Sequence, residues 1–512
     1  MKFRCVIWLW FLLFSGWQVR ATERPNILFI VTDDQSYRTV SAYPEALPWA
    51  HTPNIDRLAE RGVRFSRAYV GTWCMPARAT MLTGRLQYGV ESMRMEGEYP
   101  RAVYDPVQTP FWPRVFRENG YWTGQIGKWH TGIDNGFGRD WDHQIVWNRP
   151  RNGENAGNYY DNQLLEFNGR PGVMVRGYST DNYTRWAKEF IEGRDRDVSK
   201  PWFLWVCYSG VHAPFTPPDR HLESFPNAEV PAPADIYPPR QGKPSYSRDY
   251  AHWVPGVDGS PVLVAPAQQT VTNNQIHGNR LQDWVRQYQQ AVSALDDGVG
   301  EIMRTLEETG QLDNTLVVFT SDQGYAWGQH GFSHKIAPYD ANIRGPLIVS
   351  MPTRLPQGVV SDAAIGGHDL PPTFFAFAGL DLPWEMHGHD ITPFLHEPDT
   401  ARPRPLLTAL TGFKFGSDTH PIPTAQNEIY MGAGVPWWLS LVDGDFKYIR
   451  TLVEGEPEEL YDLRNDPEEL VNLAPQPDHR ERLLGLREAL LAELRRTDAA
   501  LIDSLPGVAV LP

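Results

Sequence analysis

One cysteine stands in a setting that suits a reactive group. Cys74 lies two residues before Pro76 and four before Arg78. Proline is favoured in the first turn of a helix and Gly84 is typical of a helix end, so Cys74 is predicted to lie at or just before a helix amino terminus. The unpaired N–H groups and partial positive charge there favour an oxyanion and a nucleophile beside it. The alternative is a buried structural cysteine next to a helix start.

Polar side chains follow three short apolar runs that are typical of strands buried on both faces. These runs span residues 26–31, 203–207 and 315–320. The polar residues that follow them are, in chain order, Asp33 and Asp34, His212, then Asp322 and Gln323. Because ligands gather at the carboxyl ends of parallel strands in open α/β sheets, the three runs indicate one common site.

The acids and the amide in this group form a candidate metal site. Asp33, Asp34, Asp322 and Gln323 offer oxygen ligands, which suit calcium or magnesium, whereas zinc prefers histidine and cysteine. The alternative is that the paired aspartates cap or turn the chain after a strand.

The elements that must position these residues alternate along the chain. Helical patterns cover residues 52–61, 181–191 and 282–309, with glycine as the stop signal after the first and the last. Strands alternating with helices predict an α/β sandwich. Residues 212–279 lack a regular pattern and are rich in proline, which indicates either a substrate-facing insertion or a disordered loop.

The chain changes character near residue 400. Short alternating segments separated by turns, such as the one at Gly444, predict an antiparallel sheet, and residues 478–496 have the pattern of an amphipathic helix. We therefore expect a main domain over residues 22–400 and a smaller α+β subdomain over residues 401–512.

The composition indicates a folded globular protein. Of its 512 residues, 41% are hydrophobic and 21% are charged. The formal net charge of −15 argues against a nucleic-acid partner, since phosphate binding requires clustered lysine and arginine. An anionic substrate must therefore meet a local positive site.

Residues 1–21 have the pattern of a cleaved export signal. A basic start precedes an apolar run too short to span a bilayer, and a Val-x-Ala site follows it. We expect a periplasmic or secreted protein without a stable membrane anchor; an uncleaved anchor is the alternative. Cleavage would leave two cysteines, Cys74 and Cys207, and Cys207 lies in an apolar run where a free cysteine behaves as a core residue.

Three motifs resemble the type I sulfatases of the alkaline-phosphatase-like superfamily. The first is Cys74-x-Pro76-x-Arg78 with the flank at residues 79–84. The second, residues 120–130 (Gly-Tyr-Trp-Thr-Gly-Gln-Ile-Gly-Lys-Trp-His), matches the second family motif at every defined position and is the most specific. The third is the closing pattern at residues 460–473. Trp73, Met75, Ala77 and Gln323 depart from the usual family residues.

The resemblance implies a role for each candidate residue. A maturation enzyme would oxidise Cys74 to formylglycine, whose hydrate attacks sulfur and also binds the calcium or magnesium ion held by Asp33, Asp34, Asp322 and Gln323. Arg78 and Lys128 would stabilise the developing charge, and His130 would take the proton that allows sulfate to leave. His212 and Lys335 would grip the sulfate and protonate the leaving oxygen. The candidates for contact with the organic part of the substrate are His334, Trp129 and Trp327.

The sequence thus predicts an exported, metal-dependent sulfatase that acts on a sulfate monoester, with a sulfated carbohydrate favoured over an aryl or steroid sulfate. Degradation of a sulfated polysaccharide would fit this substrate class. Two alternatives remain: a phosphonate or phosphate ester hydrolase on the same scaffold, and a non-catalytic glycan-binding relative.

Overall fold

The computed structural model describes residues 24–90, 105–264, 280–398, 404–412, 422–423, 429–430 and 434–508. The expected export signal, residues 1–21, lies outside these ranges. None of the helices within them combines the length and the apolar character needed to cross a bilayer.

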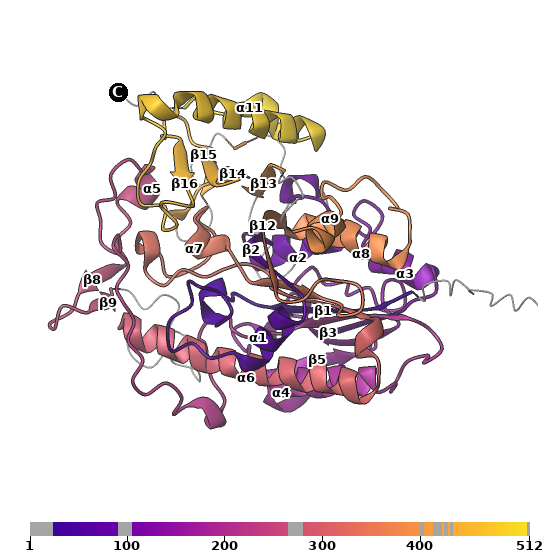
Figure 1. Cartoon of the computed structure of the whole chain (residues 1–512). Helices are drawn as coiled ribbons and strands as arrows, with labels where there is room; N and C mark the ends of the chain where they lie inside the picture. Colours follow the sequence, from indigo (N-terminus) through magenta and orange to yellow (C-terminus); the bar gives the residue numbers. More distant parts are fainter. Residues whose placement is uncertain are drawn as a thin grey trace, which may run out of the picture.

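A ten-stranded mixed sheet forms the centre of the molecule (Figure 1). In spatial order its strands are β12 (Val359–Gly366), β2 (Val63–Tyr69), β11 (Leu347–Ser350), β10 (Thr315–Ser321), β1 (Asn26–Thr32), β7 (Trp202–Cys207), β3 (Trp122–Lys128), β4 (His143–Trp147), β5 (Asp161–Phe167) and β6 (Val173–Tyr178). The three strands predicted from apolar runs, β10, β1 and β7, are adjacent, and β1 pairs with both neighbours in parallel. Their carboxyl ends therefore lie at the same edge of the sheet.

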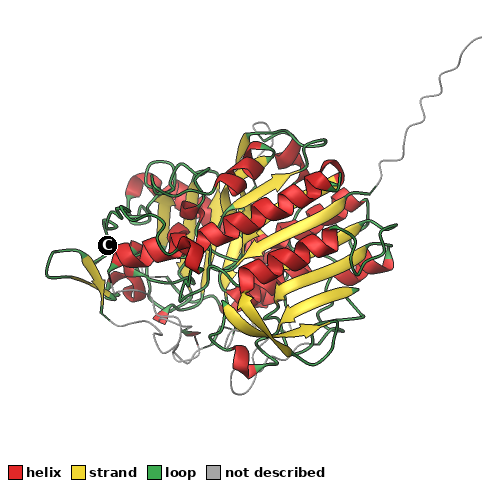
Figure 2. Ribbon diagram, turned by 90° about the horizontal axis from the view of Figure 1, so that it is seen from below, coloured by secondary structure: helices red, strands yellow, loops and turns green. Residues whose placement is uncertain are grey.

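Helices cover both faces of the sheet, as predicted for an α/β/α sandwich. One face carries α1 (Pro53–Glu60), α4 (Ser179–Ile191) and α6 (Leu281–Glu308). The other carries α2 (Cys74–Thr83), α3 (Pro113–Glu118), α8 (Leu370–Ala378) and α9 (Thr392–His396). Seen from below, helices lie in front of the strands of the sheet (Figure 2). Alternate residues of β1 enter the two cores, with Leu28 and Ile30 on the α6 side and Phe29 on the α8 side.

The segment between β7 and α6 has more structure than its sequence predicts. Within its described part, residues 212–264, it forms α5 (Ser245–Arg248) and a hairpin of β8 (Trp253–Pro255) and β9 (Pro261–Leu263). Arg240 is buried and its guanidinium donates to four main-chain carbonyls of the same segment. Lys243 donates to the hydroxyl of Tyr461 at 2.7 Å and so ties the segment to the carboxyl-terminal sheet.

A separate four-stranded antiparallel sheet follows α9. Its strands are β13 (Leu406–Leu410), β14 (Trp438–Asp443), β15 (Phe446–Thr451) and β16 (Glu459–Asp462). Helix α11 (Arg480–Arg496) packs on it through leucines such as Leu490 and Leu494. The short α7 (Asp340–Ile343) lies in the loop between β10 and β11. The predicted fold class, including the antiparallel sheet and terminal helix, is confirmed, whereas the domain boundary at residue 400 remains a prediction.

Candidate active site

The strand ends bring three carboxylates together. Asp33 and Asp34 directly follow β1, and Asp322 directly follows β10. The main-chain N–H of Asp34 donates to Asp322 Oδ1 at 3.1 Å. One oxygen from each of these carboxylates and the sulfur of Cys74 all lie within 4.8 Å of one another. This cluster has the acidic, buried character that a divalent cation requires.

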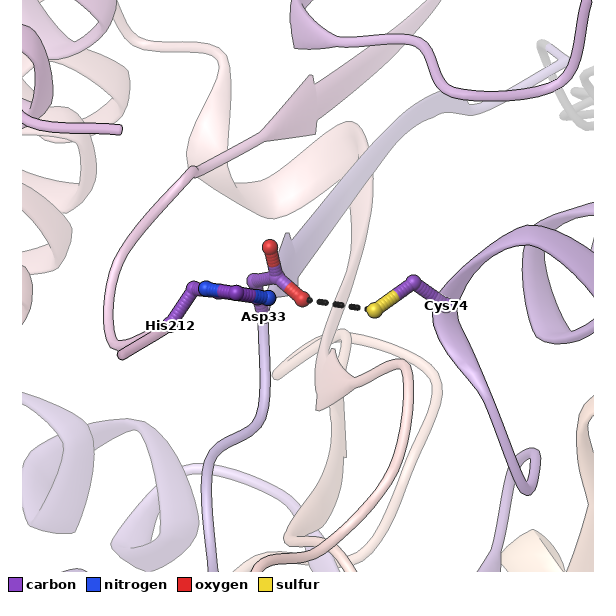
Figure 3. Close-up of side chains that lie close together, drawn as sticks. All are labelled: Asp33, Cys74 and His212. Carbon is purple, nitrogen blue, oxygen red and sulfur yellow. Dashed lines mark hydrogen bonds between the residues drawn. The ribbon is translucent and has the colours of Figure 1, made fainter. Parts of the chain in front are cut away.

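Cys74 reaches the cluster because it is the first residue of α2. Pro76 occupies the first turn, and Gly84 ends the helix in the left-handed conformation with φ 72°, as predicted. The thiol donates to Asp33 Oδ1 at 3.2 Å (Figure 3), and Lys335 Nζ lies 2.9 Å from the sulfur. Burial, with the nearby Asp33 carboxylate as a further cause, raises the pKa of the Cys74 thiol to about 12. The unmodified cysteine would therefore be a protonated, weak nucleophile at neutral pH.

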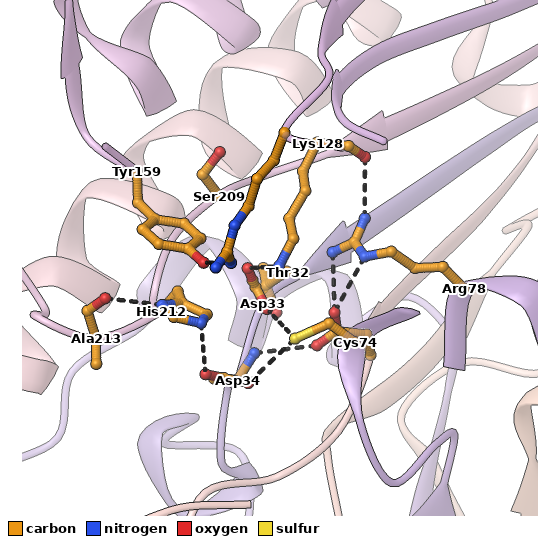
Figure 4. A network of polar contacts seen from close by, with 12 residues as sticks. Thr32, Asp33, Asp34, Cys74, Arg78, Lys128, Tyr159, Ser209, His212 and Ala213 are labelled. Atoms are coloured by element: carbon orange, nitrogen blue, oxygen red, sulfur yellow. Dashed lines mark hydrogen bonds and ion pairs between the residues drawn. The ribbon is translucent and has the colours of Figure 1, made fainter. Parts of the chain in front are cut away.

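Three buried cations face the three carboxylates, and Figure 4 shows two of them, Lys128 and Arg78. Lys128 forms an ion pair with Asp33. Lys335 Nζ donates to both oxygens of Asp34 at 2.7 and 2.9 Å. The guanidinium of Arg78 donates from Nε and Nη2 to Asp322 Oδ2 at 3.2 and 2.9 Å. Without a bound ion the ionised site is thus close to neutral.

The pKa values of Asp33 and Asp322 are shifted in opposite directions. Burial alone would raise the pKa of Asp33, but Lys128 and the other nearby cations hold it well below its usual value. Burial, followed by the charge of Asp33, raises the pKa of Asp322 to about 7. Removal from water is the larger cause of this rise, and the nearby Asp33 carboxylate adds to it because a second negative charge disfavours ionisation.

Lys128 can reach the site because glycine precedes it. A Cβ on Gly127 would lie 2.1 Å from the carbonyl oxygen of Cys207 on the neighbouring strand β7, and Gly127 has φ 102°. Only glycine allows β3 and β7 to approach this closely at that φ. This contact explains the Gly-Lys pair of the second motif.

His130 follows β3 in a left-handed backbone conformation, with φ 62°. Its ring is buried, and its Nδ1 has no hydrogen-bond partner in the part of the chain that the structure describes. Burial, reinforced by Lys128 and Arg78, holds the pKa of His130 well below its usual value. A neutral imidazole of this kind can accept a proton.

His212 lies on the opposite side of the acids from Cys74 and joins the same cluster. Its Nδ1 lies 2.7 Å from the carbonyl oxygen of Ala213, and its Nε2 lies 3.7 Å from Asp34 Oδ2. Burial, together with Lys335, holds the pKa of His212 well below its usual value. The structure thus places His212, Lys335, Lys128 and Arg78 around the acids and Cys74.

The three candidates for contact with the organic part of the substrate lie in different surroundings. Trp129 is fully buried and packs against Trp141 and Trp205 in the core on the α8 side, so the structure does not bring it to the site. Trp327 is also buried and packs on Tyr288. His334 precedes Lys335, and its Nε2 lies 3.2 Å from the Tyr250 hydroxyl. Apolar packing draws an indole into the core even when its neighbours in sequence carry chemistry.

Sequence reasoning missed Tyr159 and Arg149. The ring of Tyr159 stacks on His212 with 3.8 Å between centroids, and Arg149 donates to its hydroxyl. Neither residue belongs to a motif, and no sequence signal links a tyrosine before β5 to a histidine after β7.

Comparison with known proteins decides the family. The family model described as Sulfatase matches residues 25–380, a range that includes all the candidate catalytic and metal-binding residues. The chain belongs to the sulfatase family. Over 515 aligned residues this sulfatase is 28% identical to the N-acetylglucosamine-6-O-sulfatase of Bacteroides thetaiotaomicron, with 92% of this chain and 87% of the relative covered. It is therefore an enzyme of the sulfatase type.

Solved structures share the fold of this sulfatase. One is a protein in complex with its substrate D-glucosamine-2-N,6-O-disulfate, with a TM-score of 0.75, 23% identity, and coverage of 93% of this chain and 98% of that chain. Another is the phosphonate monoester hydrolase of Agrobacterium radiobacter, with a TM-score of 0.64, 22% identity, and coverage of 93% and 96%. These similarities confirm the predicted alkaline-phosphatase-like architecture.

Proposed function

We propose that this sulfatase hydrolyses a sulfate monoester of a sugar through a formylglycine formed from Cys74, beside a divalent cation. The observation that carries the proposal is the meeting of Cys74 with Asp33, Asp34 and Asp322 inside a ring of buried cations. These residues come from elements separated by up to 289 positions in the chain, as Asp33 and Asp322 are.

The residues present fit a calcium or magnesium ion. Three carboxylates lie close together in a buried site, where burial and then the charge of Asp33 raise the pKa of Asp322 to about 7. The buried Oε1 of Gln323 has no hydrogen-bond partner within the described residues, while the Nε2 of the same amide faces Asp34. Turning the amide would direct its oxygen toward the acids, an arrangement that a cation favours. Asp33, Asp34, Asp322 and Gln323 would hold the ion, which would supply positive charge against the oxygens of a bound sulfate.

Charge balance favours an anionic substrate. Arg78, Lys128 and Lys335 neutralise the three carboxylates, so a divalent cation would leave the site with two excess positive charges. A sulfate monoester carries one negative charge and would offset half of this excess, and Lys128 and Lys335 are positioned to shift their ammonium groups from the acids to the sulfate oxygens. Preorganised cations of this kind stabilise charge that grows in a transition state.

The surroundings of residue 74 suit formylglycine better than an unmodified cysteine. The hydrated aldehyde of formylglycine offers one hydroxyl for attack on sulfur and a second that expels sulfate from within the same residue. Lys335, 2.9 Å from the sulfur, is positioned to bind an oxygen at residue 74. His130, neutral because of burial and nearby cations, would take the proton released when sulfate leaves.

His212 would supply the proton for the departing sugar oxygen. Its Nε2 lies 3.7 Å from Asp34 Oδ2, and its side chain is 17% exposed. Burial and Lys335 hold the pKa of His212 well below its usual value, and a bound sulfate ester would raise it because an adjacent negative charge stabilises imidazolium.

The substrate class rests on the relatives. The Bacteroides thetaiotaomicron relative is named for N-acetylglucosamine-6-O-sulfate, and the structural neighbour was solved with a disulfated glucosamine. We therefore propose a sulfated hexosamine, with N-acetylglucosamine-6-sulfate as the first compound to test. Release of inorganic sulfate from it by the purified enzyme is the expected result, and no release from a panel of sulfated amino sugars would contradict the substrate class.

Substrate preference distinguishes a sulfatase from the alternative phosphonate hydrolase, because the Agrobacterium radiobacter phosphonate monoester hydrolase shares this fold. Turnover of 4-nitrophenyl sulfate is expected to exceed that of an aryl phosphonate monoester. A clear preference for the phosphonate would contradict the proposal. Intact-mass analysis of the Cys74 peptide, with an expected loss of about 18 Da, tests the conversion and excludes a purely glycan-binding protein.

Export, maturation and domain division complete the proposal. We propose that residues 1–21 are removed on export to the periplasm or medium, that a formylglycine-generating enzyme acts on Cys74, and that residues 401–512 form a subdomain. Sequencing the amino terminus of the mature protein tests the first point, with a start at Thr22 as the expected result.

A further inference from the structure

Tyr159 lies face to face with the imidazole of His212. The ring centroids are 3.8 Å apart and the ring planes differ by 8° (Figure 4). Tyr159 is only 2% exposed, and it comes from the connection between β4 and β5, outside every sequence motif. We propose that Tyr159 is a positioning residue, which holds the His212 ring in the plane that directs Nε2 at the leaving oxygen of the substrate. This inference rests on the proposed function of His212.

The other contacts of His212 leave its ring plane undetermined. A carbonyl oxygen can only accept, so Nδ1 donates to Ala213 O at 2.7 Å and Nε2 faces the site, 3.7 Å from Asp34 Oδ2. The hydroxyl of Tyr160 donates to the main-chain carbonyl of His212 and fixes the backbone. A single ring hydrogen bond still allows the imidazole to pivot about it. The stacked phenol removes that freedom.

Tyr159 is itself held from two sides. Arg149 donates to its hydroxyl, and Lys128 Nζ lies 5.5 Å from the centre of its ring. A phenol anchored at its tip and against its face cannot tilt without breaking these contacts. Tyr159 thus connects the imidazole of His212 to the ammonium of Lys128.

Orientation of His212 matters most when the leaving oxygen is basic. As the bond from sulfur to the sugar oxygen breaks, its electron pair stays on that oxygen, which takes the Nε2 proton and leaves His212 neutral. A sugar alkoxide needs this proton, whereas 4-nitrophenolate departs without it. Misalignment of His212 should therefore slow hydrolysis of a sugar sulfate selectively.

The test is the ratio of kcat/KM for N-acetylglucosamine-6-sulfate to that for 4-nitrophenyl sulfate, measured on the mature enzyme with converted Cys74. We expect Tyr159→Leu and Tyr159→Met to lower the sugar sulfate value about 100-fold and the aryl sulfate value less than about fivefold. Tyr159→Phe keeps the stacked ring and loses only the Arg149 bond at its tip, so its ratio should lie much closer to that of the unaltered enzyme than to that of Tyr159→Leu. Because both rates come from one preparation, partial unfolding lowers them equally and leaves the ratio unchanged.

Phe190→Leu is the matched control, since Phe190 is a buried ring of the same core that packs on His143 outside the site. It should leave the ratio unaltered.

The variant His212→Ala is the reference. If it lowers kcat/KM for both substrates equally, the acid role of His212 is wrong. We expect His212→Ala instead to lower kcat/KM selectively for the sugar sulfate. If Tyr159→Leu and Tyr159→Met then lower kcat/KM for both substrates equally, only the positioning role of Tyr159 is overturned. In the double variant, Tyr159→Leu should add little to His212→Ala on the sugar sulfate.

Discussion

Asp322→Asn tests the metal site and the buried ion pair together. Asp322 and Arg78 have side chains that are 0% exposed, and two guanidinium nitrogens donate to one oxygen of Asp322. Asparagine keeps the shape of the side chain and one acceptor oxygen but removes the charge. Arg78 is then buried without its counter-charge, and the proposed cation loses one of three carboxylates.

The expected loss of unfolding free energy in Asp322→Asn follows from these contacts. Removing one partner of a buried ion pair costs about 3–5 kcal/mol of unfolding free energy, and the retained amide oxygen places Asp322→Asn near the lower value. Calcium at 100 times its Kd should stabilise the unaltered protein by about 2.7 kcal/mol. If loss of a ligand weakens binding about 100-fold, the same calcium concentration stabilises the variant by only about 0.4 kcal/mol.

The assay is denaturant unfolding of metal-free and calcium-loaded protein, which needs no activity measurement. Asp296→Asn is the matched control, because Asp296 is a buried carboxylate that accepts the main-chain N–H groups of Asn54 and Ile55 at 3.0 and 2.9 Å, away from the site. The control should keep the full calcium effect. A full calcium effect in Asp322→Asn would refute the assignment of Asp322 as a ligand.

The other predictions concern the nucleophile, the cation and one lysine. Cys74→Ala should abolish turnover without loss of folded protein, whereas Cys207→Ala, which alters a core cysteine, should keep it; retained activity in Cys74→Ala would remove the proposed nucleophile. Burial and then Asp33 raise the pKa of Asp322 to about 7, and the cation binds the deprotonated form. Calcium affinity measured by calorimetry should therefore fall about tenfold per pH unit below 7, and a flat profile from pH 8 to 5 would contradict this. Lys335→Met should lower kcat/KM about 100-fold, and the surface change Lys188→Met should have no effect in the same sulfate-release assay.

Local sequence patterns predicted the elements that carry the site. Helix α2 begins at Cys74 because proline suits its first turn, and it ends at Gly84 because only glycine adopts that backbone conformation without strain. Strands β1, β7 and β10 were predictable because burial on both faces demands continuous apolar residues. These signals lie within a few residues of one another, so they can be read from the chain alone.

Contacts between distant segments were not predictable in the same way. Trp129 and Trp327 lie beside site residues in sequence, yet packing places both in the core. Tyr159 reaches His212 only because the connection before β5 folds over the end of β7. Side-chain direction depends on which neighbours fill the available space, and those neighbours come from the whole chain.

By itself the sequence determined the kinds of reactive groups in this protein, their places at strand and helix ends, and the family they belong to. The tertiary structure alone decided which groups touch: that Lys335 contacts the sulfur of Cys74, that each carboxylate has its own cation, and that a tyrosine outside every motif stacks on His212. The physical reason is that backbone preferences act over a few neighbouring residues, whereas charge pairing and ring stacking act through space between residues that only the folded chain brings together.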